Sequence, residues 1–425
     1  MGLPLPGELV SEILIRLPAK SVAQMRSVSK AWNHMLSKPS FIKSHLNRSL
    51  DNQEDEVLLV LLNGNYYEDV FSITAHLSRS PHLQLQLPDF IEFPNSPPPP
   101  DPFSITFIGS VNGLICYDYR TDHYRQNDYV IQIWNPSLSA VLTLPPFNGL
   151  DWFLIYDSTH ELHFRFGYDP KTDDYKLLKL MSYTLPADPL DDDYPPGMGD
   201  IIQPERDFNN SINDVKEVEV YSMRNGSWKL LQNRLPAHIT RITDEDVVCS
   251  DGHDGRLHWI GSSVNGSKQT IVTFDLGVES FGEICLPNSV ILRDWRNSLG
   301  FYSGKLCVMS FGKGYEHEVW VMNEYGVAES WTKIRIFSDF GDNIDPHGFT
   351  TSNKFLFSTL SDDPMRGLTY DRLNIYDPDA DEVKSFETDA RDGIRTKIVR
   401  YVDSLVWVAP TKQIQPAAEI SQIER

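Results

Sequence analysis

A tight turn followed by an apolar residue recurs along this chain at a spacing close to fifty residues. Gaps of 49, 49 and 50 residues separate the apolar positions, which are Leu257, Leu306, Phe355 and Leu405. An earlier copy at Leu114 lies 143 residues before Leu257, close to three such periods, which predicts an intermediate copy at Leu162. Repetition at this period, with several short strands per unit, is typical of β-propeller blades. One blade cannot cover both faces of its own sheet, so the units are expected to stack into a closed ring.

The repeat predicts an all-β, kelch-like propeller over residues 49–409, with six blades expected and seven as the alternative. Strands with alternating apolar residues are followed by a strand that carries a Trp, as at Trp228 and Trp331, or that ends in Leu-Pro. We expect the first blade to pair strands at residues 57–62 and 70–77 with a final strand at residues 400–408. That pairing would join the two ends of the chain and leave no open sheet edge.

The first 48 residues follow a different period and predict a small all-α unit of three to four short helices. Leu5, Leu9, Ile13 and Leu17 recur every four residues, which places an apolar stripe along one helix face. Pro6 suits the first turn of that helix, and Pro18 ends it. A further helix carries Val28, Trp32 and Leu36, with Ser27 or Ser29 as its N-cap. A unit this small is near the lower limit for supporting its own core, so part of its apolar surface must meet the rest of the chain or a partner.

The order and spacing of these residues resemble an F-box, the module that docks onto a Skp-type linker protein in cullin-based ubiquitin ligases. The shared features are the two Leu-Pro steps, the Ile13-Leu14 pair between them, and the later Val28-Ser29-Lys30-Ala31-Trp32 run. The alternative is an ordinary helical hairpin that caps the next domain. The resemblance implies that the linker-binding surface includes residues among Leu5, Pro6, Ile13, Leu14, Leu17, Pro18, Val22, Val28 and Trp32. Some of these must instead hold the F-box together.

Three later runs extend the resemblance over most of the chain. They are Trp134-Asn135-Pro136, the FGYDP run at Phe166 with the DYK that follows, and the EVYS run at Glu219 with the SW that follows. Together they resemble the F-box-associated interaction domain of many plant F-box proteins, a group that includes the S-locus F-box proteins, which recognise S-ribonucleases. The implied function is the substrate-recognition subunit of an SCF-type ubiquitin ligase. The alternatives are an interaction scaffold outside any ligase and, less favoured, a kelch-type enzyme. The expected organisation is an F-box at 1–48, the propeller at 49–409 and a mobile tail at 410–425.

Motifs for catalysis or cofactor binding are missing from the sequence, so no catalytic, metal or cofactor-binding residue is predicted. The chain has no Gly-rich nucleotide loop, no Gly-x-Ser-x-Gly and no Cys-x-x-Cys pair. His160 and His163 lack the four-residue spacing that places two imidazoles on one helix face for zinc. His253 and His258 flank a turn, and the run Asp191–Asp193 lacks a Gly-punctuated ligand pattern.

The net charge of −21 is distributed unevenly and limits the class of partner. Residues 1–50 carry a balance of +5, which leaves −26 for residues 51–425, and residues 188–214 hold eight acidic side chains and one basic one. Such a field opposes binding to nucleic acid or to an anionic membrane and favours a basic protein target. The alternative is that the acidic surface serves solubility alone.

Four cysteines with no close pair, and no secretory signal at the start of the sequence, predict a cytoplasmic or nuclear protein. The apolar run at residues 57–62 is too short to cross a bilayer, so no membrane partner is expected. The proline-rich run at residues 95–102 has two interpretations, a stiff connection between strands or a ligand for a proline-binding module.

Overall fold

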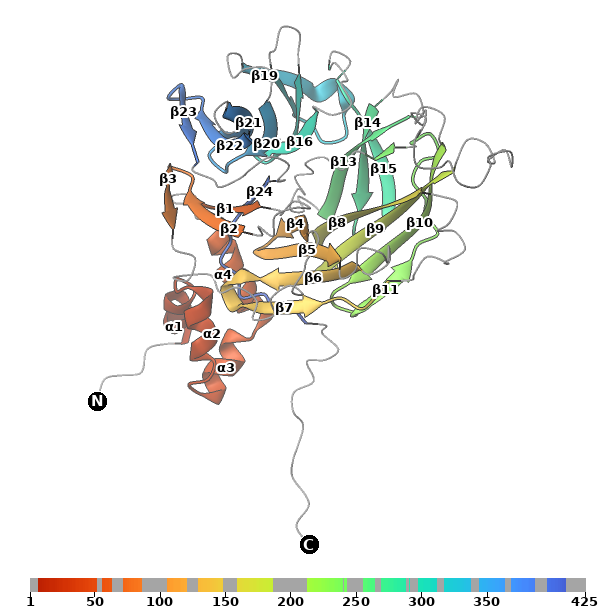
Figure 1. Ribbon diagram of the computed structural model, residues 1–425. Helices are drawn as coiled ribbons and strands as arrows, with labels where there is room; N and C mark the ends of the chain where they lie inside the picture. The colour runs from red at the N-terminus through yellow and green to blue at the C-terminus, as the bar shows by residue number, and fades with distance from the viewer. Residues whose placement is uncertain are drawn as a thin grey trace, which may run out of the picture.

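The computed structural model describes residues 7–51, 56–62, 72–85, 105–120, 129–147, 159–185, 212–239, 241–242, 255–263, 269–287, 290, 297–311, 317–337, 344–363, 368–386 and 396–409. In these segments four N-terminal helices precede six four-stranded antiparallel sheets arranged as the blades of a propeller (Figure 1). The predictions of an N-terminal helical unit and of a six-bladed ring are confirmed. The domain limits at 48 and 409 stay predictions, and residues 410–425 lie outside the described part of the chain.

The helices are short and end where the sequence breaks them. They are α1 (Gly7–Leu14), α2 (Ala19–Met25), α3 (Lys30–Leu36) and α4 (Pro39–Asp51). Ser29 is the N-cap of α3, because its hydroxyl oxygen accepts a hydrogen bond from the backbone N–H of Trp32 at 3.1 Å. Pro39 begins α4, since a proline is tolerated in the first turn of a helix but not in its interior.

Each blade is a sheet of four strands that follow one another from one edge of the sheet to the other. Blade 1 is β24 (Thr396–Arg400), β1 (Val57–Leu62), β2 (Ser72–Leu77) and β3 (Ser80–Leu85). Blade 2 is β4 (Ile105–Val111), β5 (Leu114–Arg120), β6 (Tyr129–Asn135) and β7 (Ala140–Thr143). Blade 3 is β8 (Thr159–Asp169), β9 (Asp174–Leu185), β10 (Ile212–Ser222) and β11 (Ser227–Leu230).

The other three blades repeat this order of strands. Blade 4 is β12 (Arg241–Ile242), β13 (Arg256–Ser262), β14 (Gln269–Asp275) and β15 (Ser280–Cys285). Blade 5 is β16 (Ser298–Tyr302), β17 (Lys305–Phe311), β18 (His317–Met322) and β19 (Trp331–Phe337). Blade 6 is β20 (Ile344–Phe349), β21 (Phe355–Asp363), β22 (Leu368–Asp377) and β23 (Glu382–Ser385).

The recurring turn of the sequence joins the first two strands of a blade where it precedes Leu114, Leu306 and Phe355, whereas the copy at Leu405 lies outside the sheets. In blades 2 and 5 it is a two-residue loop, Asn112-Gly113 and Ser303-Gly304, and all four residues have positive φ. This backbone matches the twist of an antiparallel hairpin and favours Asn and Gly, which explains why the turn is conspicuous in the sequence. The apolar residue after it, for example Leu114 or Leu306, is buried at the start of the second strand.

Blade 3 departs from the expected spacing, so the marker predicted at Leu162 is wrong. Leu162 lies inside β8, and the corresponding turn precedes Asp174. The strands β8 and β9 have 11 and 12 residues, against seven for β4 and β5. These longer strands displace the turn along the chain, so a fixed period does not locate it.

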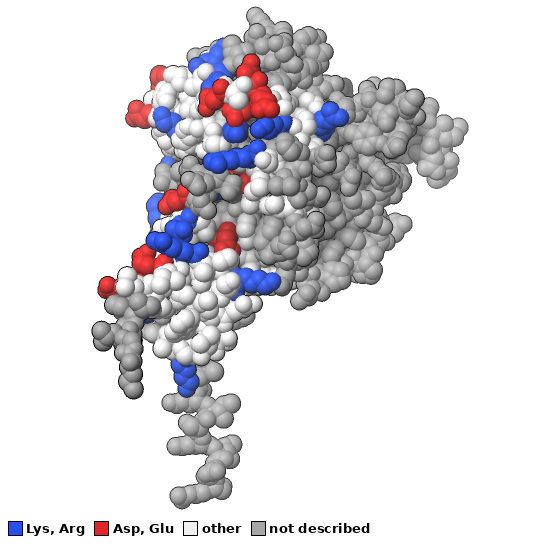
Figure 2. All heavy atoms as spheres, turned by 90° about the vertical axis from the view of Figure 1, so that its left-hand side faces the viewer, with Lys and Arg blue, Asp and Glu red and all other residues white. Residues whose placement is uncertain are grey.

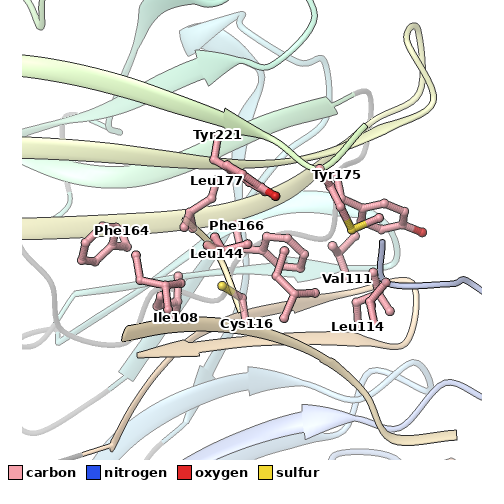
Figure 3. Close-up of a cluster of buried hydrophobic side chains, with 14 residues drawn as sticks. Ile108, Val111, Leu114, Cys116, Leu144, Phe164, Phe166, Tyr175, Leu177 and Tyr221 are labelled. Carbon is pink, nitrogen blue, oxygen red and sulfur yellow. The ribbon is translucent and has the colours of Figure 1, made fainter. Parts of the chain in front are cut away.

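Apolar clusters between neighbouring blades make up the core of the ring. Six such clusters lie at the six junctions, including the one between blades 6 and 1. Figure 3 shows the cluster between blades 2 and 3, where side chains from β4 and β5 meet those of β8, β9 and β10. Burial of this apolar surface at all six junctions stabilises the closed arrangement.

The ring closes in blade 1, but not with the strand that the sequence suggests. The strand that pairs with β1 is β24, with Leu58 opposite Arg400 and Leu62 opposite Thr396. The predicted strand at residues 400–408 is therefore wrong beyond Arg400. Residues 401–409, which we call the C-terminal clasp, form no strand. Within the clasp Leu405 is buried against the helices and Val408 is buried between blades 2 and 3, whereas Trp407 is exposed.

Candidate partner-binding surface of the N-terminal helices

The apolar stripe of the N-terminal helices divides into an exposed set and a buried set. Leu9 is 51% exposed, Ile13 is 53% exposed and Val28 is 68% exposed. Leu14 and Val22 are buried in a cluster that also contains Ala19, Leu36 and Phe41. Leu9 and Ile13 are one helical turn apart on α1, and exposed apolar side chains on a small helical unit are typical of a surface that binds another protein.

The structure places the predicted linker-binding residues in four different situations. Ile13, Val28 and Pro18 are exposed, Leu14 and Val22 are buried, and Leu17 and Trp32 are half-buried against the helical cluster. Leu5 and Pro6 lie outside the described residues. Leu9 belongs to the same stripe and was not among the predicted binding residues, although it is about as exposed as Ile13. Whether any of them binds a partner stays a prediction.

The part of the surface where the helices lie carries few charged groups on the side shown in Figure 2. Lys, Arg, Asp and Glu lie over the upper part and the left side of that view, whereas a white region with few charged groups lies below them. On α1 the exposed side chains of Leu9 and Ile13 are flanked by exposed Glu8, Glu12 and Arg16. Apolar side chains with a charged rim suit a partner that contributes apolar side chains of its own.

The helices are attached to the propeller through an apolar and a polar contact. Leu405 of the C-terminal clasp and Leu138 of blade 2 pack into the helical cluster with Leu14 and Val22. The carboxylate of Asp403 accepts a hydrogen bond from the backbone N–H of Ala19, 2.7 Å away. Pro18, at the N-cap of α2, has no side-chain acceptor, so Asp403 supplies the cap from the other end of the chain.

The last helix is attached to blade 1 at its C-terminal end. The guanidinium of Arg400 donates to the carbonyls of Ser49 and Leu50, at 3.4 and 2.8 Å. These are carbonyls of the last helical turn, which has no intrahelical donor for them. Arg400 also lies 3.9 Å from the carboxylate of Glu56, and burial raises the pKa of that carboxyl.

The histidines considered as metal ligands do not form a metal site in the described part of the chain. His163 and His258 are buried in different blades, and His258 is hydrogen-bonded to the hydroxyl of Tyr325 at 2.8 Å. Burial lowers the pKa of His258 to about 3. Among the described residues no group of three or more His, Cys, Asp or Glu side chains could hold a metal ion. His253, residues 95–102 and Asp191–Asp193 lie outside these segments.

Comparison with known families agrees with this architecture. Residues 58–396 match the F-box associated beta propeller domain, and residues 3–44 match the F-box domain. The fold and the match define the class: an F-box followed by a six-bladed propeller. The chain belongs to the F-box proteins with an F-box associated β-propeller domain.

Similar proteins of known sequence include several F-box proteins of Arabidopsis thaliana. F-box protein CPR1 is 28% identical over 349 residues, which cover 78% of this chain and 72% of that protein. F-box protein At4g22390 is 26% identical over 343 residues, covering 77% and 73% of the two chains. F-box/kelch-repeat protein At3g23880 is 23% identical over 353 residues, covering 80% and 82%. None of the described helices is long and apolar enough to span a membrane.

Proposed function

We propose that this chain is the substrate-recognition subunit of an SCF-type ubiquitin ligase. The N-terminal helices bind a Skp-type linker, and through it a cullin, while the propeller binds a protein target. The observation that supports this most directly is the exposure of Leu9, Ile13 and Val28 on an F-box whose own core is already filled by Leu14, Val22 and Leu405. These exposed side chains contribute to a surface that a partner can cover.

The proposed contribution to ubiquitin transfer is proximity. Proteins that combine these two domains are generally non-catalytic adaptors, and the chain matches both domains. The ligase also holds the enzyme that carries ubiquitin. Holding a target near that enzyme converts a bimolecular encounter into an effectively intramolecular one. No catalytic group of this chain is needed for that effect.

The test is binding to a purified Skp-type linker. Leu9→Asp combined with Ile13→Asp should weaken binding at least tenfold, because two charges would enter an apolar interface. Val383→Asp is the matched control, since Val383 is 43% exposed but lies on the outer strand β23 of blade 6. Equal binding by wild type, double variant and control would contradict the assignment of the linker-binding surface. Failure of the wild type to co-purify with linker and cullin would favour a scaffold outside the ligase.

The target is proposed to be a basic protein, on the strength of the −26 balance beyond residue 50. Most of the acidic segment at 188–214 lies outside the described residues, so the proposal depends on charge alone. Recognition of an S-ribonuclease is a narrower version that depends only on the resemblance of three sequence runs. Affinity purification with the proteasome blocked identifies the target and tests both versions. Recovery of acidic targets only would contradict them.

A further inference from the structure

The C-terminal clasp contributes side chains to three apolar clusters, the third through Tyr401, which packs between blades 1 and 2. Leu405 packs into the cluster of the helices, whereas Val408 packs into the cluster between blades 2 and 3. Ser404, which precedes both, is fully buried. One short segment after the last propeller strand therefore contacts the F-box on one side and the ring on the other.

The amide of Asn135 holds the clasp to blade 2. Its Nδ2 donates to the carbonyls of Ser404 and Val406, at 3.0 and 2.7 Å. Its Oδ1 accepts from the backbone N–H groups of Ser137 and Leu138, which caps the turn after β6. Both ends of this buried amide are thus used at the same time.

Two other blades have an aspartate at the position of Asn135, the last residue of the third strand. Asp275 ends β14 and Asp377 ends β22, and each uses Oδ1 to cap the turn that follows. A carboxylate is therefore sufficient for the turn. Of the three residues, Asn135 is the one bonded to the clasp. An amide can donate to the carbonyls of the clasp while its oxygen caps the turn, whereas a carboxylate has no hydrogen to donate.

The clasp approaches blade 2 so closely that a second position is restricted. A Cβ atom on Gly113 would lie 2.4 Å from the carbonyl oxygen of Val402 and 2.6 Å from the Cβ of Ser404. The hydroxyl oxygen of Ser137 accepts from the backbone N–H of Ser404 at 3.0 Å. These contacts fix the clasp on the ring, while Asp403 and Leu405 fix it on the helices.

We infer that the C-terminal clasp sets the orientation of the F-box on the propeller, and that Asn135 is the residue that holds it there. The consequence for a ligase rests on the proposed function: the clasp fixes the linker-binding surface relative to the target-binding domain. Asn135, Asp403 and Leu405 are positioning residues: Asn135 holds the clasp on blade 2, Asp403 and Leu405 hold the helices on the clasp, and none of them acts on a bound partner.

The decisive variant is Asn135→Asp, because it keeps the cap on the turn but opposes two carbonyls with a negative charge. Asp377→Asn is the matched control, with the opposite exchange at the equivalent position of blade 6, away from the clasp. Spin labels on Cys introduced at His34 and Val278 report the distance between α3 and blade 4, since both positions are exposed. Cys249 and Cys285 are replaced by serine so that the spin label reacts only with the introduced cysteines. Cys116 and Cys307 are kept, because they are buried.

We expect a narrow distance distribution in the wild type and in Asp377→Asn, and a distribution at least twice as broad in Asn135→Asp. Amide hydrogen exchange at Ser404 and Val406 should accelerate at least tenfold in Asn135→Asp alone. A narrow distribution in Asn135→Asp, with these amides exchanging fast, would overturn the inference.

A second variant covers the case in which Asn135→Asp does not fold. Deletion of residues 401–425 removes the clasp but leaves β24 in blade 1, so the ring should stay closed, with a lower melting temperature because it loses the core contacts of Tyr401 and Val408. Its distance distribution should be at least twice as broad as that of the wild type, because Leu138 and Arg400 are then the remaining described contacts to the helices. A distribution as narrow as that of the wild type would overturn the inference. Binding of purified Skp-type linker to the wild type is measured in parallel, because it tests the proposed function separately.

Discussion

Asp403 caps the helix that begins at Ala19, with 2.7 Å between the carboxylate oxygen and the backbone nitrogen and 384 positions between the two residues. Helix caps are normally supplied from within a few residues, so this bond couples the F-box to the far end of the chain.

Replacement of Asp403 by alanine should lower the stability of the F-box by about 1 kcal/mol, the usual contribution of an N-cap. Asp403→Asn is the control, because its amide oxygen can still accept from Ala19. Hydrogen exchange of the amides in α2 measures the effect. An equal loss of stability in the two variants would mean that the negative charge of Asp403, 3.9 Å from His45, matters and that the cap does not.

Leu14 and Ile13 are neighbours with opposite predicted effects. Leu14→Ala should lower the free energy of unfolding by roughly 2–5 kcal/mol, because Leu14 is buried among Val22, Leu36 and Leu405. Ile13→Ala should change it by less than about 0.5 kcal/mol, since its side chain is half in solvent. Urea unfolding that reports on the helices distinguishes the two. A loss from Ile13→Ala as large as that from Leu14→Ala would mean that Ile13 belongs to the core.

His258 should make the propeller sensitive to acid. Burial is the main cause of its low pKa of about 3, and the charge of Arg256 adds to it. In the unfolded state His258 therefore becomes protonated near pH 6.5, whereas in the folded state it stays neutral until the pH approaches 3. The stability associated with neutral His258 is present above pH 6.5 and is lost progressively as the pH falls from 6.5 towards 3, by up to about 1.4 kcal/mol per pH unit.

The comparison variant for this pH effect is His258→Gln, which does not titrate and can still bond to Tyr325. The difference in unfolding free energy between wild type and variant should shrink or reverse between pH 6.5 and 4. Parallel pH profiles for the two proteins would show that His258 does not control this range.

Lys179 and Glu219 form an ion pair in which neither side chain is exposed, with 3.1 Å between nitrogen and oxygen. Lys179→Met should destabilise blade 3 by about 3–5 kcal/mol, because it leaves a buried carboxylate without this partner. The double change Lys179→Met with Glu219→Leu should cost less than the single change. Thermal unfolding of the wild type, the single variant and the double variant tests this. A double variant that is less stable than the single variant would contradict it.

Removal of residues 396–425 should destabilise the whole ring, because it deletes β24 and exposes the edge of β1. The deletion that begins at residue 401 retains β24, so it is the control. Melting temperatures that agree for the two truncated proteins would mean that the pairing of β24 with β1 adds little to the closed ring.

The sequence was sufficient for the fold where the determining contacts are local. The turn at Asn112-Gly113 is recognisable because two adjacent residues need positive φ, and the N-cap at Ser29 is recognisable from its own helix. The position of Leu162 was mispredicted because the lengths of β8 and β9 depend on packing across blades.

The binding surface and the clasp could be predicted only in part. A four-residue period shows that Ile13 and Leu14 lie near an apolar stripe, but it does not show which side of the stripe meets the propeller. Asn135 lies in a recognisable Trp-Asn-Pro run, yet its partner Ser404 is 269 positions away. Contacts of that range leave no periodic signal in a single sequence.

The position of Leu405 in the sequence means that the core of the helices is completed late in translation. A ribosome delivers the four helices first, and it delivers the residue that completes their core only after the strands of all six blades up to β24. A chain that terminates early in any blade therefore carries helices with an open apolar slot and no cap on α2. The core of the N-terminal helices is therefore complete only once translation has passed Leu405.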